Sequence, residues 1–266
     1  MNPSAAASHL TRWPLPGGQA LEVLVSSEPE RRFAPHWHAE WSIGAVLEGR
    51  CRFACAGRAQ VAEAGDLVVM PPFALHTAGV GAQAFRMAMV YAPHDWLADR
   101  LGWPRDRAPG IATVTHDAAA AAALGDAAQH AAAQPLIEVV LATVGRLAGA
   151  PSAAWQPPAV THDARIEQLC RVLQAADDAG TIDLRVLAAQ VGVSREHLHR
   201  LFRSALGLSP LAYARLARIA RAKTLLGEGH AAASVAADCG FADQAHFSRW
   251  FRRCFGVTPS RYLAGA

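Results

Sequence analysis

Long apolar segments, disulfide frameworks and a recognisable signal peptide are all missing from this 266-residue sequence. The longest apolar runs, such as LVVMPPFAL, are short and broken by proline, and none approaches the ~20 residues that cross a membrane. The first residues show no basic start followed by an apolar block, so we expect a cytoplasmic protein with no signal peptide. The five cysteines form no CxxC pair, which argues against a disulfide framework or a zinc ribbon.

Lysine is nearly absent, because Lys223 is the only one in the chain. The positive charge is therefore carried by arginine, and it is unevenly distributed. Residues 161–266 hold 14 basic and 9 acidic side chains, whereas residues 1–160 hold 11 and 13. The planar guanidinium group suits bidentate contacts with phosphates and base edges. The asymmetry favours a polyanionic partner for the second half, although a solvated helix face would give the same count.

The first half of the sequence indicates β-structure followed by helices. Residues 20–92 hold short runs such as WSIGAVLEG and FRMAMVYA, separated by glycine, proline and polar turns. This pattern is typical of an antiparallel barrel or sandwich. Residues 94–149 are rich in alanine and leucine and predict helices. Together they predict a first domain, residues 1–149.

An apolar stripe marks the last of these predicted helices. Leu136, Val140, Val144 and Leu147 recur at helical spacing, so they would pack either on the β-structure or on a second subunit. Residues 150–163 are rich in proline and small side chains, and we predict a linker there.

Residues 164–266 predict an all-helical domain with an internal repeat. One unit, LAAQVGVSREHLHRLFRSALGLSPLAY, begins at Leu187, and the other, VAADCGFADQAHFSRWFRRCFGVTPSRY, begins at Val235. Each predicts a short helix, a turn with glycine, a second helix and a terminal glycine, which is the layout of a helix-turn-helix. Ser194 and Asp243 are the predicted N-caps of the second helices.

Each second helix should have a packed side and a cationic side, as a helix that enters a DNA major groove requires. The side chains predicted to face inward are Leu198, Leu201, Phe202, Phe247, Trp250 and Phe251.

The segment between the two units, SPLAYARLARIARAKTLLGEG, predicts one long helix that begins at Pro210. Its polar face would hold Arg215, Arg218, Arg221 and Lys223. The helix would separate the two second helices so that they enter successive major grooves, roughly 34 Å apart. A duplicated helical pair that docks another protein is the alternative.

These motifs resemble the AraC/XylS family of bacterial transcription regulators over roughly residues 166–262. GF, HFSRWF and GVTPSRY are the segments that carry the resemblance most specifically. It implies seven helices and two helix-turn-helix units that bind double-stranded DNA, usually to recruit RNA polymerase. The residues that it places at the DNA are Glu196, His199, Arg200, Arg203, Gln244, Ala245, His246, Arg249, Arg252 and Arg253.

Within that set, Arg200 and Arg249 are the best candidates for base contacts, because arginine to guanine is the commonest specific contact. Arg203, Arg252 and Arg253 are better candidates for phosphate contacts. Ala245 stands where a longer polar side chain is common in the family, so base reading by the second unit would be sparser or carried by neighbouring residues.

The first half resembles the cupin-type sensor domain of many such regulators, over about residues 15–92. PHWHAEWSIGAVLEGRCRF resembles the first cupin motif and GDLVVMPPFALH the second, with Gly65, Pro71 and His76 at the expected spacing. The glutamate expected four or five residues after His38 is absent, and Phe73 stands where metal-binding cupins usually have glycine. The expected fold is therefore α+β and multidomain, with a cupin-like β-barrel and helices followed by the helical domain.

Three histidines and a carboxylate form the candidate effector site. His36, His38 and Glu40 alternate, so they would share one face of a strand, and His76 could converge on them. Neutral histidine and carboxylate oxygen suit a divalent metal such as zinc, iron, nickel or manganese. The same groups could instead form hydrogen bonds with an organic effector.

The neighbouring aromatic and cysteine side chains are interpreted as structural. Trp37 and Trp41 would lie on the opposite face of the strand from the histidines. Cys51 and Cys55 are interpreted as packing residues, with a smaller place left for soft-metal or redox sensing.

Taken together, these features predict a homodimeric DNA-binding regulator with a small-molecule effector and no catalytic residues. A metal-sensing regulator, or a metal-dependent cupin enzyme with a DNA-targeting module, is the alternative.

Overall fold

The computed structural model of the protein describes residues 9–26, 33–78, 85–106, 108–130, 132–149, 164–175 and 183–265. The chain divides into two units, Met1–Gln156 with Ala264–Ala266, and Pro157–Leu263. The predicted linker, residues 150–163, lies outside the described residues. Among the described helices, none combines the length and the apolar character that a membrane span requires.

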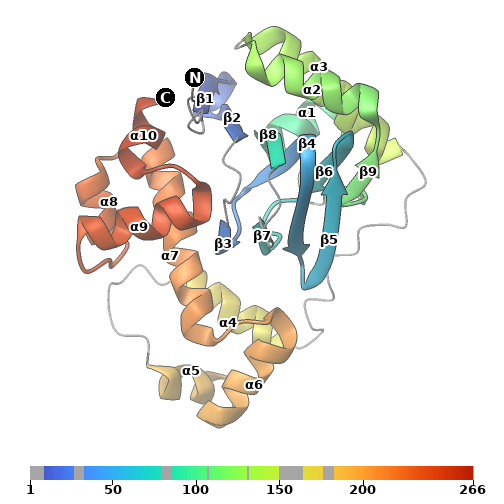
Figure 1. Ribbon diagram of the computed structural model, residues 1–266. Coiled ribbons are helices and arrows are strands. Elements are labelled where there is room, and N and C mark those ends of the chain that lie inside the picture. The colour runs from blue at the N-terminus through green and yellow to red at the C-terminus, as the bar shows by residue number, and fades with distance from the viewer. Residues whose placement is uncertain are drawn as a thin grey trace. The chain divides into compact units, whose positions relative to one another are not determined.

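The first unit is a sheet-rich domain with helices on one side (Figure 1). Its described strands are β1 (His9–Pro14), β2 (Ala20–Ser26), β3 (Phe33–His36), β4 (Glu40–Cys55), β5 (Arg58–Glu63), β6 (Asp66–Met70), β7 (His76–Ala78), β8 (Phe85–Pro93) and β9 (Val114–His116). A short 3-10 turn, Pro16–Gly18, joins β1 to β2. Its described helices are α1 (His94–Leu101), α2 (Ala118–Gln129) and α3 (Ala133–Gly149).

Strand β4 is shared between two antiparallel sheets. Its first part pairs with β8 and β6, in a sheet with the order β1-β2-β8-β4-β6-β9. Its last part pairs with β5 and β7, and β7 also pairs with β3. The register against β8 shifts between Val46 and Glu48, and Gly49 has a φ of 74°. Because glycine adopts this left-handed conformation readily, the chain can bend here and pass from one sheet into the other.

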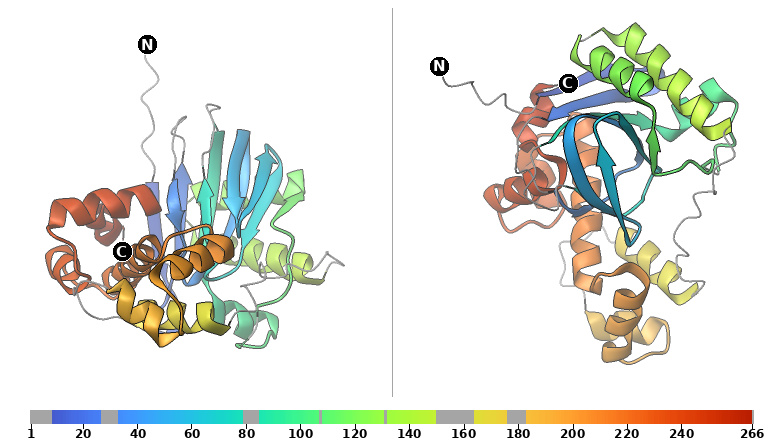
Figure 2. Two further views of the ribbon diagram at one scale, coloured as in Figure 1. Left: turned by 90° about the horizontal axis from the view of Figure 1, so that it is seen from below. Right: turned by 45° about the vertical axis from the view of Figure 1, so that its right-hand side comes forward.

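Side chains of β4 and β8 alternate between two buried faces, as strand geometry requires. Ile43 and Val90 belong to an apolar cluster that includes residues of α1, α2 and α3. Val46, Met87 and Met89 belong to a second cluster on the opposite face. The three helices therefore cover one face of the larger sheet, while its other face lines the interior (Figure 2).

The apolar stripe of α3 packs within its own chain. Leu136, Val140 and Val144 are fully buried, and all of the stripe belongs to the cluster between the helices and the sheet. The stripe therefore packs within the apolar cluster that α3 shares with α1, α2 and the sheet, and its direct helix contacts are with α2 and α1.

The second unit contains seven helices within its described residues, in agreement with the predicted family pattern (Figure 1). They are α4 (Ala164–Ala175), α5 (Leu184–Gln190), α6 (Arg195–Leu206), α7 (Pro210–Gly227), α8 (Ala232–Asp238), α9 (Gln244–Phe255) and α10 (Pro259–Ala264). The pairs α5–α6 and α8–α9 are the two predicted helix-turn-helix units, and α7 is the predicted long helix between them.

The two units of the repeat pack alike. Phe202 meets Tyr213 with ring centroids 5.9 Å apart and planes at 69°. The equivalent residues, Phe251 and Tyr262, lie 5.5 Å apart with planes at 70°. Such edge-to-face pairs add to the stabilisation that the burial of each ring supplies. The sequence repeat is therefore also a repeat of side-chain packing.

Three side chains depart from the predicted helix faces. Leu201 and Trp250 are partly exposed, unlike the fully buried Phe202 and Phe251. The placement of Lys223 on a polar face of α7 was wrong, because this residue is only 5% exposed. Its ammonium group lies 5.7 Å from the ring centroid of Tyr262, where the aromatic face compensates part of the lost hydration.

We expect Leu136→Ala to lower the free energy of unfolding by about 2–5 kcal/mol, because it leaves a cavity in the apolar cluster that α3 shares with α1, α2 and the sheet. Tryptophan fluorescence during urea unfolding would measure this change. Val61→Ala is a suitable control in the same unit, since Val61 is 47% exposed and should change stability by less than about 1 kcal/mol. A variant with normal stability but altered oligomeric state would contradict this packing of α3.

Candidate functional site

The turns of the two helix-turn-helix units are set by a glycine and an N-cap. Gly192 and Gly240 have φ values of 66° and 68°, a region that other residues rarely adopt. The Ser194 hydroxyl accepts a hydrogen bond from the His197 amide at 3.1 Å. The Asp243 carboxylate accepts one from the His246 amide at 2.6 Å. These caps define where α6 and α9 begin, as predicted, and so fix which side chains occupy the first turns.

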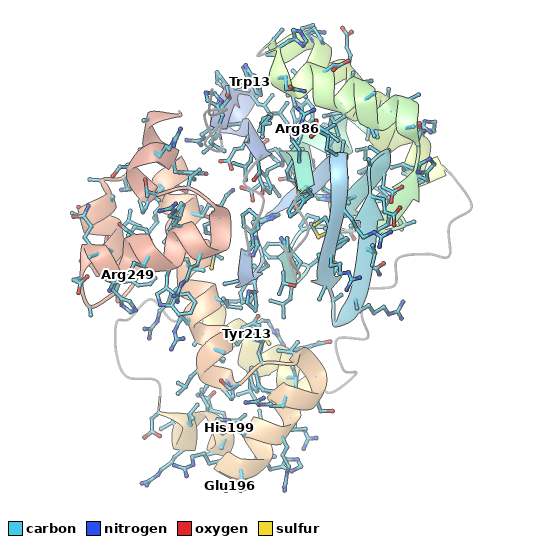
Figure 3. All side chains as sticks on the ribbon, viewed as in Figure 1. Trp13, Arg86, Glu196, His199, Tyr213 and Arg249 are labelled. Carbon is cyan, nitrogen blue, oxygen red and sulfur yellow. The ribbon has the colours of Figure 1, made fainter. Side chains whose placement is uncertain are left out.

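The predicted DNA-contacting side chains lie on the solvent side of α6 and α9. His199 and His246 are partly buried. The other predicted contacts are exposed: Glu196, Arg200, Arg203, Gln244, Ala245, Arg249, Arg252 and Arg253. Figure 3 shows Glu196 and His199 on the first of these helices and Arg249 on the second. Opposite them, Leu198, Phe202, Phe247 and Phe251 are fully buried. Each helix therefore has the packed side and the cationic side that its sequence predicts.

His246 is the least accessible of the predicted DNA contacts in the second helix-turn-helix, α8–α9. Its ring lies 5.8 Å from the ring of Phe241, and its Nδ1 is buried with no hydrogen bond among the described residues. The imidazole thus packs against the turn between α8 and α9. Gln244 and Arg249 are the longer side chains near the start of α9 that extend into solvent.

Trp250 organises two arginines beside α9, a feature that the sequence analysis missed. The guanidinium carbon of Arg215, from α7, lies 4.8 Å from its ring centroid, and that of Arg253 lies 5.8 Å away. Such cation–π contacts contribute ~0.5–1 kcal/mol at exposed sites. The arrangement joins α7 to α9 and holds Arg253 in place, which suits a phosphate contact.

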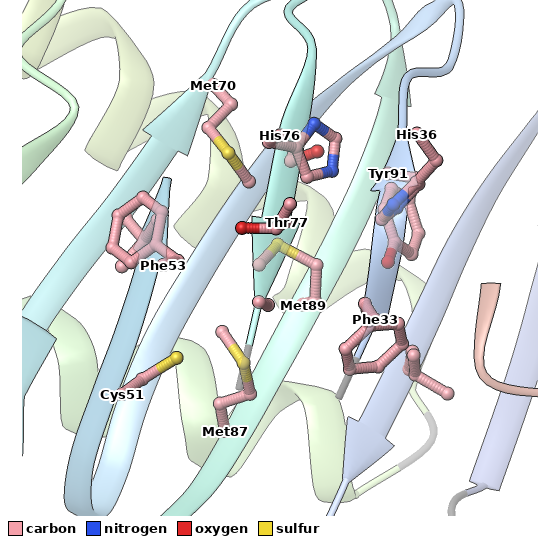
Figure 4. A pocket seen from close by; sticks show the side chains of 14 residues that line it. Phe33, His36, Cys51, Phe53, Met70, His76, Thr77, Met87, Met89 and Tyr91 are labelled. Carbon is pink, nitrogen blue, oxygen red and sulfur yellow. The ribbon is translucent and has the colours of Figure 1, made fainter. Parts of the chain in front are cut away.

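The first unit holds a cavity between its two sheets (Figure 4). Its lining residues are Leu24, Phe33, His36, Ser42, Cys51, Phe53, Val68, Met70, His76, Thr77, Ala78, Met87, Met89 and Tyr91. Figure 4 shows His36 and His76 toward one end and Cys51 and Met87 toward the other. The cavity is therefore largely apolar, with its imidazoles gathered at one end.

The three predicted histidines meet at this end of the cavity. His36, His38 and His76 are at most 5% exposed, and one ring nitrogen of each lies within 4.8 Å of the others. The ring centroids of His36 and His76 are 4.2 Å apart, and those of His38 and His76 are 5.0 Å apart. Tyr91, which the sequence analysis did not single out, has its ring 4.8 Å from that of His38. The alternation of side chains along FRMAMVYA could have identified Tyr91, because it places Tyr91 on the same strand face as Met87 and Met89.

Each imidazole is oriented by a backbone carbonyl. Nδ1 of His36 donates to Ala34 at 2.8 Å, and Nδ1 of His76 donates to Ala74 at 2.7 Å. Nδ1 of His38 donates to the carbonyl oxygen of Glu40 at 3.1 Å. Because a carbonyl oxygen can only accept, each Nδ1 carries the proton. In the neutral ring Nε2 then has the lone pair that can bind a metal or accept a hydrogen bond.

Burial keeps at least one of these rings uncharged. The loss of hydration lowers the pKa of His76 to about 4, although its hydrogen bond to Ala74 opposes part of this shift. His76 is therefore neutral at physiological pH. A neutral imidazole is the form that ligates metals.

The placement of His36, His38 and Glu40 on one strand face was wrong. Strand β3 ends at His36, β4 begins at Glu40, and His38 lies in the bend between them. The Glu40 carboxylate approaches Nδ1 of His38 at 3.8 Å and is not part of the histidine cluster.

Trp41 lies on the far side of the sheet, as predicted. It is 1% exposed within the cluster that α1–α3 cover, and its Nε1 donates to His94 at 3.0 Å.

Cys51 and Cys55 are buried in the interior cluster, at 2% and 3% exposure. Burial raises the pKa of the Cys55 thiol to about 11, so almost none of it is thiolate at neutral pH. This environment supports packing over redox sensing for that residue, because the thiolate is the reactive form.

Comparison with known sequence families matches both halves of the chain. Residues 19–138 match the family described as the AraC-like ligand binding domain. Residues 187–265 match a helix-turn-helix domain family.

Characterised relatives align over most of the chain. The transcriptional activator NphR of Rhodococcus is 30% identical over 234 residues, covering 82% of this chain and 68% of that protein. The arabinose operon regulatory protein of Escherichia coli K12 is 29% identical over 225 residues, covering 79% and 75%.

Among solved structures, ToxT from Vibrio cholerae O395 superposes with a TM-score of 0.55 at 12% identity, covering 92% of this chain and 96% of that one. A second structure of ToxT, with an unsaturated fatty acid bound, gives the same TM-score. At this identity the likeness shows a shared fold.

We expect the buried thiols to resist alkylation in the folded protein. Burial raises the pKa of Cys254 to about 12 and that of Cys55 to about 11, so at pH 8 both should react with iodoacetamide at least about 100-fold more slowly than after unfolding in urea. Mass spectrometry of the labelled peptides would measure each rate. Rapid labelling of native Cys55 would instead indicate a reactive, sensing thiol.

Proposed function

The chain belongs to the AraC family of transcription regulators, and from this premise we propose which of its residues recognise DNA and which recognise the effector. The DNA-binding half is a pair of helix-turn-helix units, and the other half is a ligand-binding domain. We propose that α6 and α9 are the recognition helices and that each enters a major groove. The observation that carries this proposal is the coincidence, on both helices, of a fully buried aromatic side with an exposed arginine side.

Arg200 and Arg249 are proposed to read bases. Both are exposed and lie one turn or more inside their helices, at equivalent positions of the repeat. Arginine can donate two hydrogen bonds to the N7 and O6 acceptors of guanine, and no other side chain matches that pair of acceptors as well. Glu196, His199 and Gln244 would supply further contacts to base edges.

Arg203, Arg252 and Arg253 are proposed to contact phosphates. They lie in the last turns of α6 and α9, farther from the ends that approach the bases. Contacts of this kind position the protein on the duplex and release counterions, so they supply affinity without sequence preference.

The cavity of the first unit is the proposed effector site. Its lining is mostly apolar, with hydroxyl groups and imidazoles in few positions. Small-molecule sites have this character, because the apolar surface supplies affinity and the few polar groups supply orientation. A compact ligand with an apolar body and one polar end would fit it best.

A second copy of the chain and RNA polymerase are the further proposed partners. The stripe of α3 is buried within the chain, so a dimer contact by α2 and α3 would have to use their solvent-facing sides. Light scattering combined with gel filtration would measure whether the protein is a dimer, and in vitro transcription would test the recruitment of polymerase.

We expect Arg200→Ala and Arg249→Ala each to weaken binding to a specific site by about 1–3 kcal/mol, roughly 5- to 150-fold. The site would first be selected from random-sequence DNA by the wild-type protein, and affinities would be measured by gel shift at fixed salt. Discrimination between the selected site and its single-base variants should fall at the position that each arginine reads.

Two further variants distinguish the loss of a base contact from the loss of a phosphate contact or of positive charge in general. Arg203→Ala should weaken binding to all sequences alike and reduce the slope of log affinity against log salt by about 1. Arg58→Ala, an exposed arginine on β5 of the other unit, is the matched control and should change neither quantity. If Arg200→Ala and Arg249→Ala both bind like Arg58→Ala, then α6 and α9 are not the reading helices.

A further inference from the structure

We infer that His36, His38 and His76 form a binding site for one divalent transition-metal ion of the zinc, cobalt or nickel class. The inference refines the proposed effector site, since it places an ion at the imidazole end of that cavity. It does not depend on which residues contact DNA.

The spacing of the three rings is close to that of a metal site. A Zn–N bond of ~2.0–2.1 Å in tetrahedral geometry places ligand nitrogens roughly 3.3 Å apart. The candidate nitrogens of the three histidines already lie within 4.8 Å of one another, and all three side chains are buried. Each ring would therefore need to move by less than about 1 Å to share one ion.

The backbone holds the rings in the protonation state that a metal requires. All three Nδ1 atoms donate to carbonyl oxygens, of Ala34, Glu40 and Ala74, at 2.7–3.1 Å. Metal-binding histidines usually have their second nitrogen oriented in this way by a carbonyl or a carboxylate, which fixes the tautomer and raises ligand basicity. Three buried histidines that serve only to pack would not need the same nitrogen engaged in each.

Glu40 fits the same arrangement. Its carboxylate lies 3.8 Å from Nδ1 of His38, on the side of the ring away from the candidate ligand nitrogen. At that distance the carboxylate does not accept the Nδ1 proton, which goes to the Glu40 carbonyl, but its negative charge would favour a cation at the other side of the ring. In the sequence Glu40 is a candidate ligand, whereas its place in the structure gives it the role of a positioning residue.

One of the three imidazoles has a hydroxyl group at its Nε2 that would have to turn away before an ion could bind. His38 lies in the bend between β3 and β4, while β3 and β7 hold His36 opposite His76 in paired strands. The Ser42 hydroxyl lies 3.1 Å from Nε2 of His38, and it donates to that nitrogen because Nδ1 already carries the ring proton. Rotation of this hydroxyl about its side-chain bond would release the lone pair to an ion.

The donor set indicates which ions would bind. Three imidazoles favour zinc, cobalt, nickel or copper over magnesium and calcium, which prefer oxygen ligands. Three protein ligands also leave a fourth position for water or for an effector atom. His36 and His76 both line the cavity, so that position would be accessible from the effector site.

The test uses the full-length chain without a histidine tag, stripped with a chelator and then dialysed. Titration with Co²⁺, followed by its visible absorption, and with Zn²⁺, followed by calorimetry, would measure stoichiometry and affinity. We expect one ion per chain, a d–d spectrum typical of nitrogen ligands in a four- or five-coordinate site, and no binding of Mg²⁺ at the same concentrations. Native mass spectrometry of the wild-type protein would give the stoichiometry independently of any variant.

Variants then locate the ion. His36→Gln and His76→Gln should each weaken Co²⁺ binding by more than about 100-fold, since loss of an outer-shell partner alone costs about 10- to 100-fold. His130→Gln, an exposed histidine on the surface of the same unit, is the matched control and should bind like the wild type. Circular dichroism would show whether each variant is folded, and Glu40→Gln, which keeps all three imidazoles, should weaken binding by a smaller factor.

The outcomes separate this inference from the proposed function. Absence of saturable Co²⁺ and Zn²⁺ binding by the wild type, or unchanged binding in folded His36→Gln and His76→Gln, would overturn the metal site. Gel shifts on the same chelated preparations report DNA binding separately. If those gel shifts are normal while no ion binds, the metal site is rejected and the recognition helices stand.

Discussion

The fold of the sheet-rich first unit depends on one strand, β4, which pairs with four other strands and buries both of its faces. Its first part is held between β8 and β6, and its last part between β5 and β7. Because side chains alternate along a strand, this single segment delivers Ile43 and Ala45 to the helix-covered core, and Ser42 and Val46 to the interior. A shift of one residue in its register would exchange the two sets and place polar Ser42 under the helices. The cavity and the helical cover are thus fixed by the same pairing.

That constraint also explains why the histidine cluster is preorganised. The residues before β4 must turn from β3, and His38 lies in this bend with its Nδ1 bonded to the carbonyl of Glu40, the first residue of β4. His36 ends β3, which is paired directly with His76 at the start of β7. Strand pairing therefore brings His36 and His76 together, and the bend between β3 and β4 adds His38. The cost of burying them is met by their hydrogen bonds to carbonyls and, for His76, by loss of the charged state.

Sequence patterns predicted the repeat, the caps at Ser194 and Asp243, and the alternation of the strands, because each of these is local. A helix period or an N-cap depends on residues a few positions apart, and the physical rule applies wherever the pattern occurs. The errors involved distant or irregular contacts. Lys223 was assigned to a polar face because nothing nearby in the sequence shows that Tyr262 covers it. His38 was assigned to a strand because alternation cannot reveal a bend, and Tyr91 was missed because its neighbour is 53 residues away.

The two helix-turn-helix units pack in the same way, but they present different side chains to solvent. Both bury an aromatic pair in nearly the same geometry, so both second helices pack on the helix that follows them in the same way. On the solvent side, the first helix-turn-helix presents Glu196, Arg200 and the partly buried His199. The second presents Gln244, Ala245 and Arg249, with His246 packed against Phe241. Beside α9, Arg215 of α7 and Arg253 of α9 both lie near the ring of Trp250. If α6 and α9 are the recognition helices as proposed, the first would offer more polar groups to base edges than the second, because Ala245 has no hydrogen-bonding side chain.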